Sequence, residues 1–235
     1  MKLGIIGLPQ CGKTTLFSAL THNYNPTGQK VVDGRAQIDT AIVSVPDERI
    51  DWLSTHYRLK KISHAKITFQ DISGITTDQE SFPRSLLTIL SQVDGFIHVV
   101  RNFHDLNIPH PMQRIDIEED INILLDEFAI ADMLTVDRRL ESLKSEWDKG
   151  GGRNRSEIEY EQKLFEQLHG ALETNYGVGA VHLDKQQQKL VSGFGFLTSK
   201  PMLIVLNSDD KSHMENCLIN TGKHNNLKTA AISLM

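Results

Sequence analysis

Cysteine is scarce in this chain, with only Cys11 and Cys217 among its 235 residues. Two cysteines are too few for a disulfide framework or for a four-cysteine zinc site. Long hydrophobic runs are also absent, because no stretch approaches the roughly 18 apolar residues needed to cross a bilayer. The opening stretch, 1–7, is too short and too soon followed by Lys13 to act as a secretory signal. We therefore expect a reduced, cytoplasmic location.

Charge and composition narrow the choice of protein class. The chain carries 25 Lys and Arg against 30 Asp and Glu, so its formal net charge is −5, which disfavours nonspecific binding of nucleic acid by the bulk surface. Hydrophobic residues make up 39% and charged residues 23%, values close to those of average globular proteins. A disordered tail and a collagen-like fibre are excluded. The length suits one large domain, or one domain with a smaller second one.

Short apolar runs alternate with helical patterns through most of the chain. Strands bounded by polar or turn-forming residues are predicted at 3–6, 41–45, 65–71, 95–100, 202–206 and 228–233. Helices are predicted at 14–20 and 82–90, and a loop at 23–35. Several strands are apolar on both faces, which is typical of an α/β domain with a largely parallel sheet flanked by helices.

The middle of the chain follows a purely helical pattern. Apolar residues recur at intervals of three and four over 117–147 and again over 158–172, and the glycines 150–152 separate the two stretches. Ser156 and Glu159 have the spacing of a capping box at the start of the second helix. The pattern predicts an antiparallel helical hairpin. An ordinary helical subdomain packed on the sheet explains the same residues equally well.

The strongest motif lies at the first strand–helix junction. Residues 7–14 read G-L-P-Q-C-G-K-T, which fits G-x-x-x-x-G-K-[ST] in the strand–helix context that this motif requires. Its glycines let backbone N–H groups cradle phosphate oxygens at a helix N-terminus. The Lys13 ammonium can reach the β and γ phosphates, where it also serves catalysis, and the Thr14 hydroxyl can bind Mg²⁺. The predicted nucleotide-binding residues here are Gly7, Pro9, Gln10, Cys11, Gly12, Lys13, Thr14 and Thr15.

Two further motifs follow predicted strands. D-I-S-G at 71–74 places Asp71 where it could hold Mg²⁺ through water and the Gly74 N–H where it could sense a γ-phosphate. N-S-D-D at 207–210 has the place of an N-K-x-D base-reading loop, with Ser208 where lysine is usual. Here Asn207 and Asp210 are predicted to bind the base, and the Asp210 carboxylate favours guanine. Ser233, at the end of the last predicted strand, is predicted to join them. Simple strand-ending turns are the alternatives.

Together these residues resemble the YchF/Obg-like ATPase family, which belongs to the translation-factor class of P-loop GTPases. The phosphate loop and D-I-S-G look like the family's G-L-P-N-V-G-K-S and D-I-A-G. Further likenesses are V-P-D-E-R-I-D at 45–51, V-V-R-N-F at 99–103 and L-T-S-K-P at 197–201. The resemblance implies a Ras-like nucleotide-binding domain formed by 1–115 and 184–235, with an inserted helical, coiled-coil-like domain at 116–183. It also implies Mg²⁺, binding of ATP or GTP, and association with the ribosome.

Several residues depart from the family pattern. Gln10 replaces an Asn that helps related proteins bind K⁺, so the sequence leaves open whether K⁺ binds as a second cation beside Mg²⁺. The threonine of the first switch has no clear counterpart, and Thr40 is a candidate by position alone. Asp210 replaces a Glu associated with acceptance of ATP, which leaves GTP and ATP both open. The family's C-terminal TGS domain does not occur within these 235 residues.

The catalytic group is also unusual. Ile75 follows Gly74, where Ras-like enzymes carry a Gln that orients the attacking water. In the family a histidine on a mobile loop has been proposed to serve instead, and His110 lies at the similar position; the alternative is a solvated loop histidine. The expected function is a slow GTPase or ATPase switch that meets the ribosome or another translation component through its helical insertion, with no membrane or direct DNA binding. A nonhydrolysing nucleotide-binding module and, with less support, a P-loop kinase are the alternatives.

Overall fold

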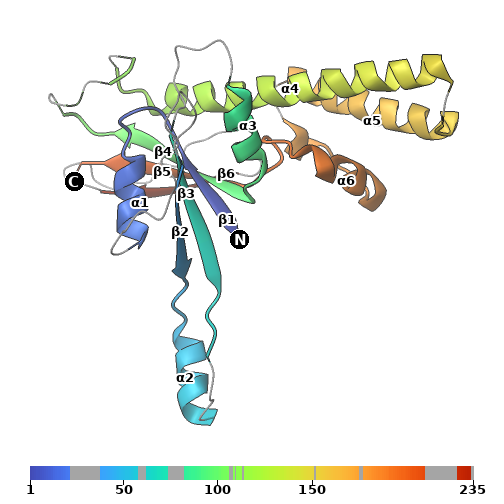
Figure 1. Ribbon diagram of the computed structural model, residues 1–235. Coiled ribbons are helices and arrows are strands. Elements are labelled where there is room, and N and C mark those ends of the chain that lie inside the picture. Colours follow the sequence, from blue (N-terminus) through green and yellow to red (C-terminus); the bar gives the residue numbers. More distant parts are fainter. Residues whose placement is uncertain are drawn as a thin grey trace.

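The computed structural model describes residues 1–21, 38–57, 62–73, 82–105, 108, 110–112, 114–150, 152–174, 177–209 and 227–233. In these residues six strands form one sheet in the order β2-β3-β1-β4-β5-β6 (Figure 1). The strands are β1 Lys2–Ile6, β2 Ile38–Ser44, β3 Lys66–Ile72, β4 Gly95–Asn102, β5 Met202–Ser208 and β6 Leu227–Ile232. β2 runs antiparallel to β3, and every other neighbouring pair is parallel. The predicted α/β fold is confirmed, with strand limits shifted by one to three residues. The predicted loop at 23–35 lies outside the described residues.

The central strands are apolar because helices cover both faces of the sheet. On one face α1, Lys13–Thr21, buries Leu16 and Phe17 against Ile5, Phe69 and other strand residues. On the other face α3, Arg84–Ser91, and the first turns of α4 cover a second cluster. The hydrophobic strand runs of the sequence therefore correspond to a sheet buried on both sides.

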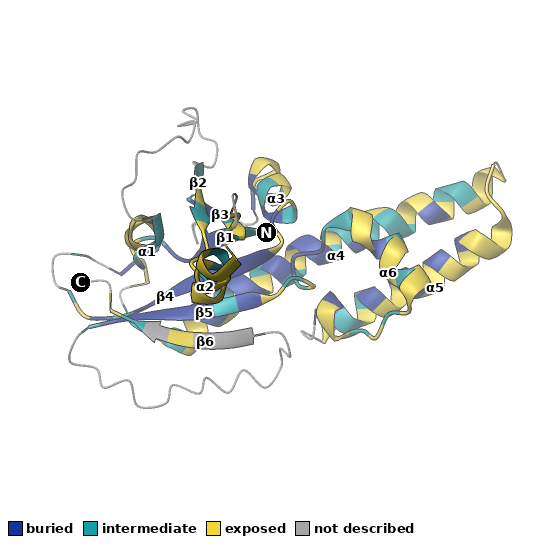
Figure 2. Ribbon diagram, turned by 90° about the horizontal axis from the view of Figure 1, so that it is seen from below, coloured by how far each residue is buried: buried dark blue, intermediate teal, exposed yellow. Residues whose placement is uncertain are grey.

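The helical pattern in the middle of the chain forms a hairpin that extends from the sheet (Figure 1). Its arms are α4, Ile117–Lys149, and α5, Arg155–Glu173. α4 serves two hydrophobic cores, because Phe128 packs with the sheet cluster whereas Val136 packs with residues of α5. Both readings of the sequence therefore apply, one to each end of α4. Figure 2 shows buried residues along the inner sides of these helices and exposed ones outside.

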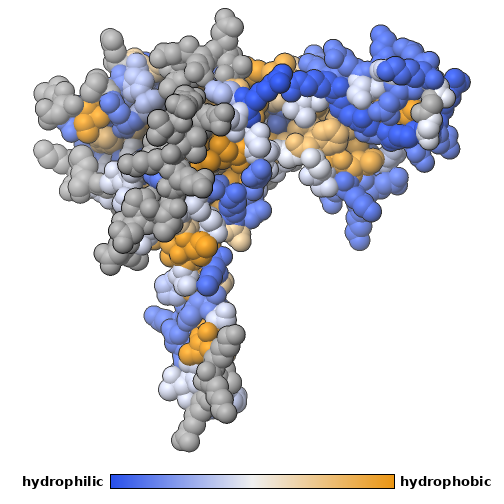
Figure 3. All heavy atoms as spheres, in the orientation of Figure 1, coloured by the Kyte–Doolittle hydropathy of each residue, from blue (hydrophilic) through white to orange (hydrophobic). Residues whose placement is uncertain are grey.

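The outer surface of the hairpin is mostly hydrophilic (Figure 3). In the described residues no helix is both long enough and apolar enough to span a bilayer. The N-cap of α5 lies two residues earlier than predicted, since it is Asn154, whose side chain accepts from the Ser156 N–H. The predicted Ser156–Glu159 box is wrong, because Glu159 lies in the second turn and pairs with Lys163 instead.

A short helix that sequence analysis did not predict also packs with the hairpin. α6, Lys185–Val191, carries a capping box in which Asp184 accepts from Gln187 N–H and the Gln187 side chain accepts from Asp184 N–H. Val191 then packs in the cluster that α4 and α5 share, as do Val178, from the 3₁₀ turn Val178–Ala180, and Phe196, which follows the 3₁₀ turn Ser192–Phe194. The domain limits at 116 and 184 stay a prediction. Part of α4, from the predicted insertion, packs with the sheet, and α6, from the predicted nucleotide-binding domain, packs with the hairpin.

A second unpredicted helix stands apart from the sheet. α2, Glu48–Tyr57, lies beyond the far ends of β2 and β3 and has no buried residue (Figure 1). The Asp47 carboxylate accepts from Arg49 N–H at its start. Trp52 is 63% exposed and stacks on His56.

Candidate nucleotide-binding site

The sheet topology brings the predicted site residues to one edge. The carboxyl ends of the parallel strands β1, β3, β4, β5 and β6 meet there, which is where ligands bind in open α/β sheets. Gly7 follows β1, Asp71 lies beside Ile5 near the end of β3, and Asn207 lies beside Ile232 at the ends of β5 and β6. Motifs far apart in the sequence thus come together.

The phosphate loop follows β1 in a conformation that its glycines permit. Gly7 has φ 149° and Gly12 has φ 103°, and Gln10, at 61°, is the one non-glycine residue with positive φ among the described residues. A Cβ added to Gly7 would lie 2.3 Å from the carbonyl oxygen of Val99, so the close packing of the loop on β4 requires glycine. The glycines therefore allow the compact loop conformation in which backbone N–H groups can bind phosphate.

Lys13 begins α1 and folds back over this loop. Its Nζ donates to the carbonyl oxygens of Gly7, at 3.0 Å, and Leu8, at 2.8 Å. The first helical bond runs from Leu16 N–H to the Gly12 carbonyl, so the earlier N–H groups of the helix end have no intrahelical acceptor and suit an anion. The ammonium and the helix end thus favour phosphate at the same place.

The other loop residues contribute in different ways. The Cys11 side chain is 2% exposed and packs beneath α1, and burial raises the pKa of its thiol. Any contact of Cys11 with a nucleotide is therefore made by its backbone. Gln10 and Thr15 are exposed at the loop surface, and Pro9 is half-buried.

The residues predicted to hold Mg²⁺ are in contact. The Thr14 hydroxyl donates to Asp71 Oδ2 at 2.7 Å. Asp71 is 2% exposed, and its second oxygen, Oδ1, is buried without a hydrogen-bond partner among the described residues. Burial raises the pKa of Asp71, while the Thr14 hydrogen bond and the Lys13 charge act in the opposite direction. A hydroxyl beside a carboxylate with an unsatisfied oxygen fits Mg²⁺, which prefers oxygen ligands.

A second carboxylate that sequence analysis missed shares this place. Asp39 lies directly opposite Asp71 in the β2–β3 ladder, on the face that α1 covers, and its Oδ1 is buried without a partner in the described chain. Its charge contributes to the raised pKa of Asp71. Thr40, the positional candidate for the first switch, lies on the opposite face, where its hydroxyl accepts from Gln70 Nε2 at 3.2 Å. Strand alternation was the signal that could have identified Asp39.

The start of the base-reading loop is tied to the phosphate loop. Asn207 is 3% exposed, and its Nδ2 donates to the Cys11 carbonyl at 3.1 Å. Its Oδ1 is buried without a partner among the described residues. Ser208, at the usual lysine position, accepts from Asn102 Nδ2 at 2.9 Å and so faces the sheet. Ser233 is the first residue after β6. Gly74 and Asp210 lie outside the described residues, and their roles stay predictions.

His110 lies in a buried contact rather than in solvent. Its Nε2 is 3.1 Å from Asp120 Oδ2 at the start of α4, and its Nδ1 accepts from Met112 N–H at 3.2 Å. The histidine is 8% exposed, so the solvated-loop alternative is wrong. Buried Arg101 holds the preceding segment by donating to the carbonyls of Phe103 and Ile108. The catalytic role of His110 stays a prediction.

Comparisons with known proteins show similarity over the regions that contain these site residues. Residues 2–136 match the model of a family described as 50S ribosome-binding GTPase. The ribosome-binding ATPase YchF of Bacillus subtilis is 35% identical over 217 residues, covering 88% of this chain and 57% of that protein. Obg-like ATPase 1 of Schizosaccharomyces pombe is 28% identical over 219 residues, covering 91% of this chain and 56% of that protein. The chain thus spans less than two thirds of the length of these relatives.

A solved structure agrees with the sequence matches. The YchF GTPase of Schizosaccharomyces pombe superimposes with a TM-score of 0.77 at 26% identity, covering all of this chain and 65% of that one. The matched region of the family model includes the phosphate loop, Asp39, Asp71 and His110. The resemblance to the YchF/Obg-like ATPases is confirmed over most of the sequence, and the chain belongs to the family of 50S ribosome-binding GTPases.

Proposed function

We propose that this chain is a nucleotide-dependent switch that binds GTP or ATP with Mg²⁺ and hydrolyses it slowly. The observation that carries the proposal is the contact between Thr14 and Asp71 beside the phosphate loop. A phosphate cradle, a lysine and a cation site at one edge of the sheet supply what phosphoryl transfer requires.

Each residue has a role in this proposal. Lys13 exchanges the carbonyl oxygens of Gly7 and Leu8 for the oxygens of the β and γ phosphates. Thr14 would hold Mg²⁺ directly and Asp71 would hold it through water, where the ion would supply positive charge to offset that of the phosphate oxygens. Gln10, exposed in the loop, offers an amide oxygen for K⁺.

Hydrolysis is proposed to be slow because the water-positioning group is held elsewhere. The residue directly after Gly74 is Ile75, not a glutamine. His110, its proposed substitute, has both ring nitrogens engaged and must leave Asp120 to act. The same observation favours a second candidate function, a module that binds nucleotide without hydrolysing it.

The base and the partner are proposed from different features. Asn207 lies where a base-reading residue is needed, and the Asp210 carboxylate suits guanine N1–H and N2–H₂, so we favour GTP over ATP. The names of the relatives include ribosome binding. We propose a cytoplasmic protein whose helical insertion, 116–183, contacts the ribosome, with the nucleotide state setting the strength of that contact.

Single-turnover hydrolysis tests the proposal. Labelled GTP and ATP are incubated with excess protein and Mg²⁺, with K⁺ or Na⁺, and with or without purified 50S subunits. We expect hydrolysis that depends on Mg²⁺, is absent in Lys13→Ala, and accelerates with 50S subunits. Tight nucleotide binding with no hydrolysis under every condition would establish the nonhydrolysing module instead. Titration with fluorescent GDP and ADP decides the base preference.

A further inference from the structure

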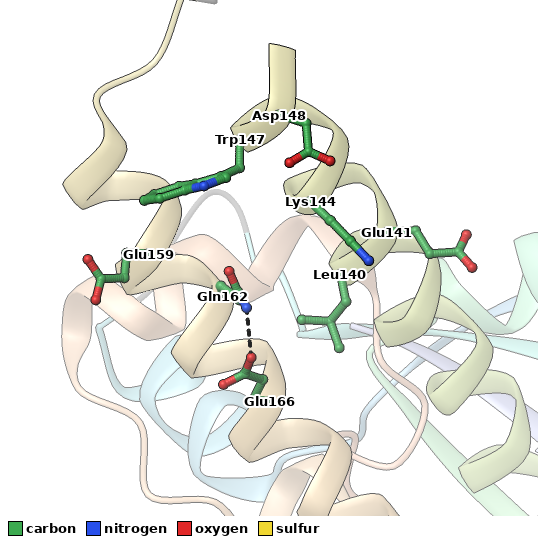
Figure 4. A pocket seen from close by; sticks show the side chains of 8 residues that line it. All are labelled: Leu140, Glu141, Lys144, Trp147, Asp148, Glu159, Gln162 and Glu166. Atoms are coloured by element: carbon green, nitrogen blue, oxygen red, sulfur yellow. Dashed lines mark hydrogen bonds between the residues drawn. The ribbon is translucent and has the colours of Figure 1, made fainter. Parts of the chain in front are cut away.

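The outer end of the hairpin contains a groove between α4 and α5 (Figure 4). Its volume is about 760 Å³, enough to hold several side chains of a docked segment. Its lining residues come from 140–148 of α4 and 159–166 of α5. The groove is therefore built by the insertion alone and shares no lining residue with the nucleotide site.

The hydrophobic part of the groove consists of Leu140 and Trp147. Leu140 packs against the hairpin core and leaves part of its side chain in the groove. The Trp147 indole is 38% exposed and in Figure 4 reaches from α4 toward α5. The Arg155 guanidinium lies 5.2 Å from its ring centroid. A partly exposed, supported aromatic ring is the type of side chain that anchors protein partners.

The rest of the lining is predominantly acidic. Glu141, Asp148, Glu159 and Glu166 provide four carboxylates against the single cation Lys144. Two of the four are shared with neighbours, since Glu159 pairs with Lys163 at 2.9 Å and Glu166 accepts from Gln162 at 2.8 Å. Glu141 and Asp148 make no hydrogen bond or ion pair with any other residue that the structure describes, so their charges remain available.

An ion-pair network fixes the two helices beside the groove. Glu161 is 4% exposed and accepts from Arg139 Nε and from Arg153 Nη2, each at 2.7 Å. Glu146 accepts from the same two arginines. These contacts hold α4 and the turn against α5, which lowers the entropic cost of docking because the walls of the groove are already in place.

We propose that this groove binds a basic, amphipathic protein segment. Lys or Arg side chains of the segment pair with Glu141 and Asp148, and a large apolar side chain lies against Leu140 and Trp147. Nucleic acid fits poorly, because its phosphates would face four carboxylates on a chain of net charge −5. The inference rests on the proposed function, since it names the chemistry of the partner that the insertion captures.

Fluorescence anisotropy of a labelled peptide tests the proposal. The probe is an amphipathic helix of about four turns made of Lys and Leu, compared with a peptide in which Ser replaces Leu and with an RNA hairpin. We expect saturable binding of the Lys–Leu peptide, at least about tenfold weaker in Glu141→Lys/Asp148→Lys, and similarly weaker in Trp147→Ala. The matched controls Asp126→Lys/Glu157→Lys, with the same change in net charge, and Trp52→Ala should bind within about twofold of the parent.

Several results would overturn the groove assignment. They are no saturable binding of the Lys–Leu peptide, equal binding of the Ser-containing peptide, equal losses in the control variants, or tighter binding of the RNA hairpin. Circular dichroism establishes that each variant keeps its helices. Titration with fluorescent GDP and ADP on the same proteins separates the two proposals, because peptide binding does not require a functional nucleotide site.

Discussion

The side chain of Asn207 donates a hydrogen bond to the backbone carbonyl of Cys11 across 196 residues of sequence, at 3.1 Å. Both groups are buried, so the start of the base-reading loop and the phosphate loop are held as one unit. A nucleotide that contacts one loop therefore meets the other in a fixed position. This is preorganisation of the binding site before the ligand arrives.

Replacing Asn207 with Ala should weaken nucleotide binding by roughly tenfold to a hundredfold. The change removes the bond that holds the two loops together, so the free site must become ordered when nucleotide binds, at a cost up to the roughly 1–3 kcal/mol that such a buried hydrogen bond is worth. Titration with fluorescent GDP and ADP measures the loss. Ser208→Ala is the control, because it removes only the hydrogen bond with Asn102. Equal affinities for both variants and the parent would show that the Asn207 contact does not shape the site.

Lys13→Ala should reduce triphosphate affinity by at least about a hundredfold while leaving the fold intact. Among the described residues the ammonium bonds only to the loop carbonyls of Gly7 and Leu8, which can turn to water in its absence. With nucleotide bound, the same ammonium makes charge-assisted hydrogen bonds to phosphate, each worth about 1.5–3 kcal/mol. Nucleotide titration together with a thermal melt checks both halves. Unchanged nucleotide affinity in a folded variant contradicts the assignment of the phosphate loop.

The phosphate loop could be predicted from sequence because its function depends on the local backbone. Gly7, Gly12 and Lys13 act within one strand–helix turn, and their spacing alone specifies the cradle. Asp39 and His110 could not be placed in this way. Asp39 meets Asp71 only through strand pairing, and His110 is buried only because Asp120 lies at the start of a different element.

The missed α2 has a related explanation. Its Trp52, Leu53 and Tyr57 remain exposed, so this ten-residue helix joins no hydrophobic core, and its apolar pattern is too short to identify a helix by spacing alone. The capping error at Ser156 arose because Asn154, two residues earlier, is an equally suitable cap. The hairpin itself could be predicted because apolar residues at intervals of three and four place a hydrophobic stripe on one side of each helix. The stripes of α4 and α5 pack against one another.

Asp39→Asn should weaken Mg²⁺ binding to the nucleotide complex severalfold. The substitution removes a negative charge directly across the ladder from Asp71 while preserving the size of the side chain. It should also lower the pKa of Asp71, because the Asp39 charge helps to raise it. Mn²⁺ binding followed by electron paramagnetic resonance in the presence of GDP measures the effect, with Asp126→Asn as an exposed control. A Mn²⁺ affinity equal to that of the control would place Asp39 outside the cation site.

Substitutions at His110 and Asp120 can distinguish a structural role of His110 from a catalytic one. His110→Ala and Asp120→Ala should both lower the free energy of unfolding by about 1–3 kcal/mol, because each leaves the other side chain buried without its hydrogen-bond partner. Only His110→Ala should reduce single-turnover hydrolysis, since Asp120→Ala releases Nε2 for the attacking water. If neither substitution changes the rate while both destabilise the fold, the histidine is structural.

Asp132 should make the stability of the fold depend on pH. It is 3% exposed on α4 and accepts from Leu197 N–H, Thr198 N–H and the Thr198 hydroxyl, which joins the long helix to the segment before β5. Burial raises its pKa from 3.8 to about 6, although these donors and Lys200 favour the charged form. Between these two values the folded chain holds a proton that the unfolded chain has lost, so the free energy of unfolding falls as pH rises.

The contribution of Asp132 is therefore complete below pH 3.8 and is lost as pH rises through about 6. The difference between the two pKa values corresponds to at most about 3 kcal/mol. Asp132→Asn keeps the shape of the side chain and cannot titrate, so its urea unfolding curves at pH 4 to 8 form the reference, and all other titrating groups cancel in the comparison. We expect the parent to lose stability relative to Asp132→Asn over this range. A difference independent of pH would mean that the three hydrogen bonds keep the carboxylate charged throughout, because a group that never changes protonation cannot link stability to pH.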